Sequence, residues 1–454
     1  MQHNKNASST VSVHNIYQLD GRVPLGKAIP FGIQHILAMF VSNITPIIIV
    51  AGAAGLSHSE LAMLLQNCMV VAGIGTMIQL YPVWKIGARL PIVMGVSFTF
   101  VSILCFVAAT YGYPAVIGAV LVGGIFEGTL GLFAKYWRKI ISPVVAASVV
   151  TAIGFSLLNV GANSFGGGVG APDFGSAKNL LVGTATLISC LLFNILAKSY
   201  WKQLSVLFGL AVGYILAFAL GMVDISGIMD GGIIALPHFL PFKPEFHLSA
   251  ILSVGVIFLV SATETIGDTS AMVVSGLDRD ITEEEISGSL GCDGYASAIS
   301  SLFGCLPVTS FSQNVGLIAM TKVVNRFTIL TGAACMILCG LFPPLGAFFA
   351  SLPECVLGGC TIMMFGSIIV SGIQMLMHCG INQRNTTIIA LSLGVGIGFT
   401  QVPEIFAIFP QMAQEILADN CVAVVFIVAV VLNLVLPQNM EIEKIQDSQK
   451  STEE

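Results

Sequence analysis

The segment CLPVTSFSQNVGLIAMTK, residues 305–322, places two adjacent amides, Gln313 and Asn314, in a chain that is otherwise largely apolar. It opens on Leu-Pro, and the residue before a proline is disfavoured in the α-helical conformation. The stretch that follows, 312–322, is too short to cross a hydrocarbon layer as a helix, which takes about 20 residues. The meaning of this interrupted segment depends on whether the rest of the chain lies in a membrane.

The composition indicates that it does. Of the 454 residues, 55% are hydrophobic and only 9% are charged, and the mean hydropathy is +0.91. A soluble domain carries about 25% charged residues, so this chain could not cover a water-facing surface. The first 27 residues are polar and contain no apolar signal-peptide core, so we expect the first apolar run to belong to the mature protein. The sequence therefore predicts an all-α polytopic membrane protein.

The eleven cysteines lie singly within apolar segments, and neither a CxxC motif nor a Cys/His metal spacing occurs. They are typical of small hydrophobic side chains packed between helices, and we expect no metal site and no cofactor. No nucleophile–base pair or phosphate-binding loop points to an enzyme. No basic block suggests a nucleic acid partner.

Apolar segments recur along the whole chain. The candidate spans, about fourteen in number, lie at 28–52, 60–80, 90–108, 113–134, 141–160, 178–198, 204–224, 247–272, 287–303, 312–322, 326–349, 354–378, 385–402 and 414–437. Cytoplasmic loops carry an excess of lysine and arginine. Of the eighteen basic residues, all but Lys178 and Lys243 fall at the termini or in alternate loops. The pattern predicts an even number of spans with both termini in the cytoplasm.

Seven plus seven spans permit an inverted repeat, which suits a transporter. RLPIVMGVSFTF (89–100) resembles CLPVTSFSQNVG (305–316), and YPAVIGAVLVGGIF (113–126) echoes LPECVLGGCTIMMF (352–365). The first pair falls in the third and tenth spans, the same place in each half. Non-helical backbone at membrane depth persists only where it is buried in protein or lines a cavity. Interrupted segments at matching positions therefore predict a substrate site.

Ionisable side chains inside spans are costly, so each needs a reason. Glu264 and Asp268 are spaced i, i+4 on one helix face of the eighth span. A carboxylate accepts hydrogen bonds, and the amide of Gln313 both donates and accepts them. Together, Glu264 and Gln313 suit a planar heterocycle with alternating N–H and C=O groups. A buried carboxyl such as that of Glu264 is also a plausible proton carrier.

The other polar residues of the spans leave alternatives open. Asp293 either ties the ninth span to the eighth or takes part in proton coupling, and His35 is either a proton relay or a structural histidine. Glu127 in the fourth span is read as a helix-packing or interface residue. Asn43 and Asn67 are expected to make interhelical hydrogen bonds.

The stretch QNVGLIAMTK (313–322) resembles the signature of the nucleobase–ascorbate transporter family. That signature runs Gln, then Asn, Glu or Pro, any residue, Gly, four residues, Thr, then Arg, Lys or Gly, and every position matches. GIQHILAMFVSNITP (32–46), ETIGD (264–268), CDG (292–294) and VLGG (356–359) also follow in the order that family shows. The resemblance covers essentially the whole membrane region.

The resemblance implies a 7+7 inverted repeat with short broken or strand segments in spans three and ten. It also implies a core domain (28–134 and 247–349), a gate domain (141–224 and 354–437), and cytoplasmic tails (1–27 and 438–454). Members commonly form homodimers through the gate. The implied substrate-binding residues are Glu264, Gln313, Ser97, Phe98, Phe311 and Ser312. Proton coupling or support of the site is implied for Asp268, Asp293, His35, Asn314 and Thr321.

By the same resemblance, we expect a bacterial inner-membrane permease that imports an oxopurine, xanthine or uric acid, by proton symport. The hydroxyl of Ser97 leaves uric acid open beside xanthine. Its partners would be the nucleobase, the proton, the lipid bilayer and a second copy of the chain. A permease for uracil or another nucleobase is the alternative. A sulfate or bicarbonate-type anion transporter is less favoured, because Glu264 would repel an anion.

Overall fold

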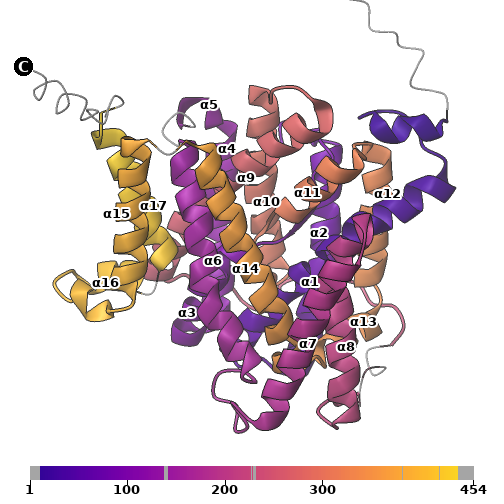
Figure 1. Cartoon of the computed structure of the whole chain (residues 1–454), viewed down its shortest axis with the longest axis horizontal. Helices are drawn as coiled ribbons and strands as arrows, with labels where there is room; N and C mark the ends of the chain where they lie inside the picture. Colours follow the sequence, from indigo (N-terminus) through magenta and orange to yellow (C-terminus); the bar gives the residue numbers. More distant parts are fainter. Residues whose placement is uncertain are drawn as a thin grey trace, which may run out of the picture.

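The computed structural model describes residues 11–137, 142–225, 228, 232–380, 382–418 and 420–437. The first half contains η2 (Val13–Tyr17), α1 (Leu25–Ala53), α2 (His58–Leu80), β1 (Met94–Val96), η3 (Phe98–Phe100), α3 (Val101–Tyr111), α4 (Tyr113–Leu132), α5 (Ala134–Trp137), α6 (Pro143–Phe165), α7 (Ala177–Leu196), η5 (Ser199–Leu204) and α8 (Ser205–Ala219) (Figure 1).

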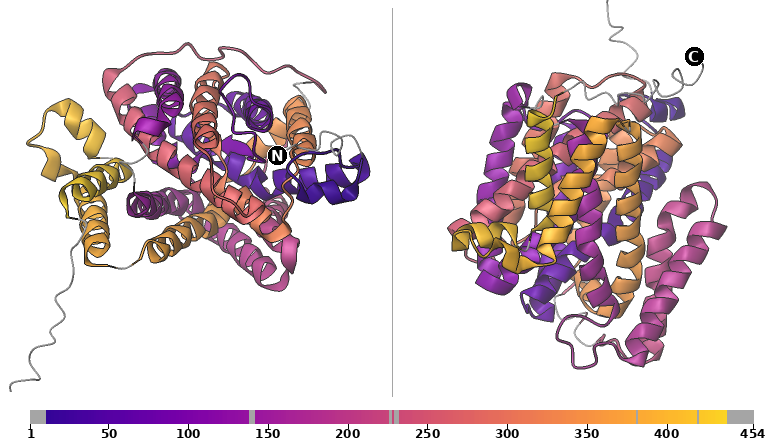
Figure 2. Two further views of the ribbon diagram at one scale, coloured as in Figure 1. Left: turned by 90° about the horizontal axis from the view of Figure 1, so that it is seen from above. Right: turned by 60° about the vertical axis from the view of Figure 1, so that its left-hand side comes forward.

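The second half repeats this order of elements. It contains α9 (Leu248–Leu277), α10 (Glu283–Leu302), β2 (Val308–Ser310), α11 (Ser312–Thr321), α12 (Arg326–Gly340), α13 (Pro343–Ala350), α14 (Glu354–His378), α15 (Gln383–Thr400), η6 (Pro403–Phe406), α16 (Gln411–Leu417) and α17 (Cys421–Val435). In Figures 1 and 2, α15 to α17 stand at one side of the helix bundle and η2 at the opposite side.

Helical elements occupy all fourteen predicted positions. Within the described ranges, eight helices are long and apolar enough to cross a membrane, and α12 with α13 form a ninth if this pair, bent by 78°, is one span. The remaining positions hold the shorter or more polar helices α3, α10, α11, α15 and α17. The prediction of an all-α polytopic fold with about fourteen spans is confirmed.

Two boundaries differ from the prediction for local reasons. The eleventh span, expected as one segment at 326–349, bends where Pro343 and Pro344 interrupt the helical hydrogen bonds. The fourteenth, expected from residue 414, begins at Cys421, because Asn420 Oδ1 accepts the N–H of Ala423 and caps α17. The preceding residues form the separate helix α16.

Helix packing shows the inverted repeat directly. α1 packs on α12 as α9 packs on α4, and α2 packs on α12 as α10 packs on α4. Likewise α7 packs on α8 as α15 packs on α17, while α6 and α14 pack on each other. In these matched contacts α12 takes the place of α4, and α14 takes the place of α6. Each of these pairs is therefore equivalent in the repeat. The predicted echo of 113–126 in 352–365 is therefore wrong, because it relates α4 to α14, which are not equivalent.

Equivalent helices also start in the same way. α2 begins with a capping box in which Ser57 and Glu60 satisfy each other's backbone N–H groups, and α10 begins with the same box from Thr282 and Glu285. This shared start is a local sign of the repeat. The contacts of α2 and α10 with the two strands lie farther along each helix, at Thr76 and Ser297.

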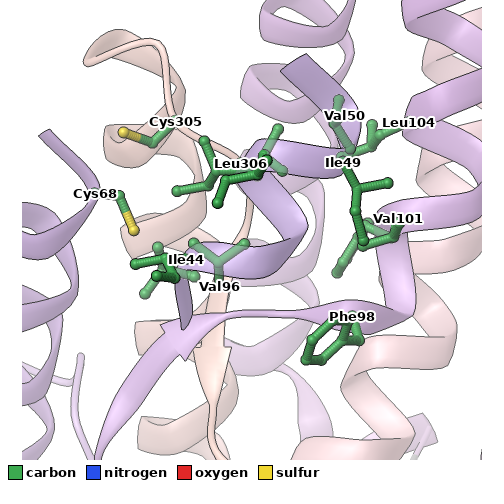
Figure 3. Close-up of a cluster of buried hydrophobic side chains, with 14 of the residues drawn as sticks. Ile44, Ile49, Val50, Cys68, Val96, Phe98, Val101, Leu104, Cys305 and Leu306 are labelled. Atoms are coloured by element: carbon green, nitrogen blue, oxygen red, sulfur yellow. The ribbon is translucent and has the colours of Figure 1, made fainter. Parts of the chain in front are cut away.

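The two Leu-Pro segments form the short antiparallel ribbon of β1 and β2. Met94 pairs with Ser310, and Val96 pairs with Val308. The strand residues are completely buried. Figure 3 shows Ile44 of α1, Val96 of β1 and Leu306 before β2 in one buried cluster, to which Phe98 also belongs. The prediction of broken or strand segments in spans three and ten is confirmed.

Side chains from neighbouring helices satisfy the outer edges of this ribbon. On β1, Met94 N–H donates to Thr76 Oγ1 (3.0 Å) and Val96 N–H donates to Asn43 Oδ1 (2.8 Å). On β2, Val308 N–H donates to Ser297 Oγ (3.1 Å). Inside a membrane no water is available to satisfy these groups, so the helices around the ribbon must. Asn43 also donates to Cys68 Sγ of α2 at 3.4 Å, which is the interhelical bond predicted for it. Asn67 instead bonds backbone groups of connecting segments.

Candidate functional site

The ribbon ends are the starting points of two half-length helices. Ser97 follows β1 and accepts the N–H of Thr99, leading through η3 into α3. Phe311 follows β2 and is the N-cap of α11, without a side-chain cap. Because the strands are antiparallel, the helices leave from opposite ends of the ribbon. Each start offers backbone N–H groups and the positive end of a helix dipole to a polar ligand.

The two carboxyls of α9 reach both half-helix starts. Glu264 Oε2 accepts the hydroxyl of Thr99 at 2.5 Å. Asp268 Oδ2 accepts Ser312 Oγ at 2.8 Å and Ser310 Oγ at 3.3 Å. Both residues are partly buried. The i, i+4 spacing thus places one acid at the start of α3 and the other at the start of α11.

Gln313 offers an unused acceptor. Its Nε2 donates to Ser42 Oγ of α1 at 3.2 Å, while its Oε1 is buried and has no hydrogen-bond partner. An unpaired buried carbonyl oxygen is rare enough to call for an explanation such as a ligand. Gln313 therefore lies in the first turn of α11, at the junction of the ribbon with the half-length helices α3 and α11, with its N–H group bonded and its oxygen unpaired. In this state Glu264 and Gln313 bond to Thr99 and Ser42, and not to each other.

Asn314 and His35 lock α11 to α1. Asn314 Nδ2 lies 3.2 Å from His35 Nδ1 and donates to the His35 carbonyl at 3.1 Å. Both residues are buried. The roles of donor and acceptor in the contact with Nδ1 depend on the tautomer of His35, whereas the bond to the His35 carbonyl is donated by the amide in either case. The contact supports a role for Asn314 in holding the half-helix, next to Gln313.

Asp293 is the most completely bonded acid of the region, and it is fully buried. Its Oδ2 accepts Thr265 Oγ1 (2.6 Å) and the N–H of Ser310 (2.9 Å), and its Oδ1 accepts Gln79 Nε2 (3.1 Å). One carboxyl thereby joins α10 to α9, α2 and the end of β2. Of the two interpretations from the sequence, these contacts favour the one in which Asp293 ties spans together.

The remaining predicted residues lie at different distances from the junction. Ser97 and Phe311 adjoin the strands, with backbone N–H groups bonded to Pro307 and Val93. Phe98 meets Phe365 of α14 edge-on, with ring centroids 5.4 Å apart. Thr321 is at the far end of α11, where its hydroxyl bonds Leu317 O. A helix of this length separates Thr321 from the ribbon by about 13 Å.

Sequence reasoning did not single out three partners of these groups: Thr99, Ser42 and Gln79. For two of them, the sequence contains a feature that could have identified them. Ser42 is seven residues after His35, so both lie on the α1 face that meets α11. Thr99 follows Ser97 in the interrupted third span. Gln79 has no such signal, because only the packing of α2 on α10 brings it to Asp293.

The structure contains two cavities of appreciable size. One, of about 590 Å³, is lined by residues of α6, α9, α14 and α15, including Thr263 and Gly267 next to the acids of α9. The other, of about 740 Å³, is lined by the end of α1, the start of α2, α13 and Glu354. Within the described residues, no group of three or more His, Cys, Asp or Glu side chains could hold a metal ion.

Comparison with known proteins gives a consistent result. Residues 26–405 match a family model described as a permease family. The chain is 35% identical to the xanthine permease XanQ of Escherichia coli over 97% of both chains. It is 33% identical to the xanthine permease of Bacillus subtilis, over 93% of this chain and 96% of that one.

Among solved structures, the fold is similar to the transmembrane domain of the cyanobacterial bicarbonate transporter BicA. The TM-score is 0.54, and the match covers 91% of this chain and 98% of that chain at 14% identity. At this identity the similarity concerns the fold alone. The family match, the two relatives and the complete signature in α11 lead to one conclusion: the chain is an integral membrane permease and belongs to the nucleobase–ascorbate transporter family.

Proposed function

We propose that this permease imports an oxopurine, xanthine or uric acid, together with protons. The observation that carries the proposal is the junction of the broken spans, where the carboxyl of Glu264 binds Thr99 at the start of α3 and Gln313 has an unpaired Oε1 in the first turn of α11. Both oxygens accept hydrogen bonds, and an oxopurine offers several ring N–H donors. Its carbonyl oxygens can be met by the free N–H groups at the starts of α3 and α11.

An anion substrate fits these contacts less well. The junction carries two carboxyls, Glu264 and Asp268, and the fold similarity to a bicarbonate transporter does not extend to its site. A negative ligand would be repelled at short range unless both acids were neutral. The names of the two relatives, both xanthine permeases, favour an oxopurine over uracil.

We further propose transport by alternating access of a core domain (28–134 and 247–349) against a gate domain (141–224 and 354–437). Support comes from packing: α6, α7, α8, α14, α15 and α17 pack chiefly on one another, and so do α1 to α4 with α9 to α13. The cavity of about 590 Å³ runs between α9 of the core and three gate helices. Movement at this boundary would open or close the path to Glu264 and Asp268.

For the proton, the proposed carriers are Glu264 and Asp268, with His35 and Asn314 fixing α11. The acids border the ligand junction, so binding and protonation can influence each other there. We also propose that the protein resides in the bacterial inner membrane with both termini in the cytoplasm, as a homodimer. The described ends of the chain, η2 and the end of α17, lie at the same end of the bundle, which supports that topology (Figure 1).

The test is uptake of labelled xanthine and labelled uric acid into cells without their own oxopurine permeases. We expect accumulation that competing oxopurines inhibit and that a protonophore abolishes. Glu264→Gln should abolish uptake while the protein remains folded in the membrane, because the amide cannot take and release a proton. Absence of uptake of both oxopurines, despite good expression, would contradict the proposed substrate. Uptake unaffected by the protonophore would contradict proton coupling.

A further inference from the structure

One buried acid of the core has no role in the site described above. Glu127 lies in α4 with 1% of its surface exposed, and neither carboxyl oxygen has a hydrogen-bond partner. Its position is enforced by close backbone packing of α4 on α10. A Cβ on Gly294 would come within 2.0 Å of the backbone nitrogen of Gly128, the residue after Glu127. The side chain is therefore confined between helices that approach too closely for it to reach water.

The surroundings of Glu127 are acidic. In the described part of the chain, the charged groups that act on it are Asp293 from α10 and Glu264 from α9, both carboxyls. The third neighbour, α3, contains no charged residue, and its Cys105 and Tyr111 lie toward the end that leads into α4. On α10, the hydroxyl of Tyr295 lies 3.4 Å from Thr129 Oγ1.

These surroundings decide the protonation of Glu127. A carboxylate without a cation, beside two other acids, is costly to keep charged in an apolar interior. The proton-bearing form of Glu127 is therefore favoured in this state, and the side chain would carry a charge only transiently. A permanently neutral acid would be a poor packing residue, because two polar oxygens are buried unsatisfied where a hydrophobic side chain would serve.

Ser261 connects this acid to the ligand junction. It is the hydroxyl of α9 close enough to donate to the Glu127 carboxyl, although neither group makes a hydrogen bond of regular geometry in this state. Ser261 precedes Glu264 by one helical turn, so the two side chains share a face of α9. Glu264 in turn bonds Thr99 at the start of α3. Three unpaired polar atoms thus lie directly behind the acid that borders the substrate.

We propose that Glu127 is a second proton-binding group of this transporter, which holds a proton while Glu264 is charged and passes it on through Ser261. The inference rests on the proposed function of proton-coupled oxopurine import. In the transfer, the O–H bond of Glu127 breaks as a new O–H bond forms on Ser261 Oγ. The original hydroxyl proton of Ser261 moves to the Glu264 carboxylate. The negative charge moves from Glu264 to Glu127, and two acids this close tolerate a single charge between them.

The test uses membrane vesicles containing the full-length protein and labelled xanthine. One assay measures accumulation driven by an imposed pH gradient, and the other measures exchange of internal for external xanthine at equal pH. Exchange requires no net proton movement. We expect Glu127→Gln to retain exchange close to that of the wild type and to lose the gradient-driven accumulation, about tenfold for each pH unit and coupled proton. Ser261→Ala should reduce accumulation in the same direction.

Ser275→Ala is the matched control, because it removes another unpartnered hydroxyl from α9, almost four turns away from Ser261. It should behave like the wild type in both assays. Accumulation by Glu127→Gln at the wild-type level, with the wild-type pH profile, would overturn the inference alone. If wild-type vesicles neither exchange nor accumulate xanthine, the proposed function falls together with the inference.

If the Glu127→Gln variant does not reach the membrane, the Glu127→Asp variant tests the proton-binding role of Glu127 instead. It keeps the acid on a shorter arm, so the distance to Ser261 changes while the charge chemistry remains. A changed pH of half-maximal uptake supports the inference, because the proton equilibrium with Glu264 is altered. An unchanged pH profile overturns it, since a residue that serves only packing would not move this midpoint.

Discussion

At the scale of single residues, the two adjacent amides of α11 differ in what their N–H groups hold. Each keeps a buried side-chain oxygen without a partner, but Asn314 donates to the backbone carbonyl of His35, while Gln313 donates to the hydroxyl of Ser42. We predict that Gln313→Ala weakens substrate binding more than Asn314→Ala does. A lost hydrogen bond to a ligand costs about 1–3 kcal/mol, which is about fivefold to 150-fold in affinity. Competition by unlabelled xanthine measures the affinity of both variants. A larger loss of affinity for Asn314→Ala than for Gln313→Ala would mean that α11 is turned differently in the bound state.

Thr99 gives a second test at this scale. Its hydroxyl donates to Glu264 at 2.5 Å, and both groups lie at the start of α3. Thr99→Val keeps the shape and removes the donor, so we expect a loss of about 1.5–3 kcal/mol in the free energy of the transport step. Thr99→Ser retains the hydroxyl and is the control. Initial uptake rates at several pH values report the effect, and equal rates in Val and Ser variants would show that the bond is dispensable.

At the scale of elements, the ribbon depends on polar side chains from outside it. Thr76 and Ser297 occupy equivalent places in the repeat and accept the N–H groups of Met94 and Val308. We expect Thr76→Val and Ser297→Ala each to lower stability by about 1–3 kcal/mol, because each leaves a buried N–H group unpaired. Thr45→Val is the control.

The control is matched, because Thr45 is also buried and bonds only the carbonyl of Val41 in its own helix. Removal of such an i−4 bond costs little. Thermal unfolding in detergent compares the three variants. A loss for Thr45→Val as large as for Thr76→Val would show that burial of the hydroxyl, rather than its bond to the strand, is what matters.

Elements with a strong local signal were predictable from the sequence. The Leu-Pro openings indicated where spans three and ten break, and spacing placed Glu264 and Asp268 on one face. The register of the strands and the partners of Asp293 were not predictable, because they depend on helices far apart in the chain. The misleading sequence similarity between 113–126 and 352–365 has a comparable explanation. Gly and aliphatic residues recur in any closely packed membrane helix, so their likeness does not identify a repeat.

At the scale of the whole molecule, a large side chain introduced at the boundary between the proposed core and gate should impair transport. Gly267 lines the cavity among α6, α9, α14 and α15, and a Cβ there meets no atom within 4 Å. We expect Gly267→Phe to fold and to bind xanthine, but to lose uptake, because the ring fills the space that opens and closes. Gly255→Phe is the control.

Gly255 belongs to the same helix and has equally open surroundings, but it is absent from the lining of that cavity. It should transport at a rate near that of the wild type. Binding in detergent and uptake in cells separate the two steps. Wild-type uptake by Gly267→Phe would mean that the cavity stays open throughout the cycle, which is incompatible with a moving boundary at this position.

The pairing of β1 with β2 also has a consequence for biosynthesis. Residues 94–96 leave the ribosome long before residues 308–310, and until then the first strand lacks the partner that satisfies its backbone. A membrane offers no substitute for those hydrogen bonds. The third segment must therefore wait at the insertion machinery or against α1 and α2 while the rest of the chain is made. Maturation of the first half should be complete only after translation has passed Ser310.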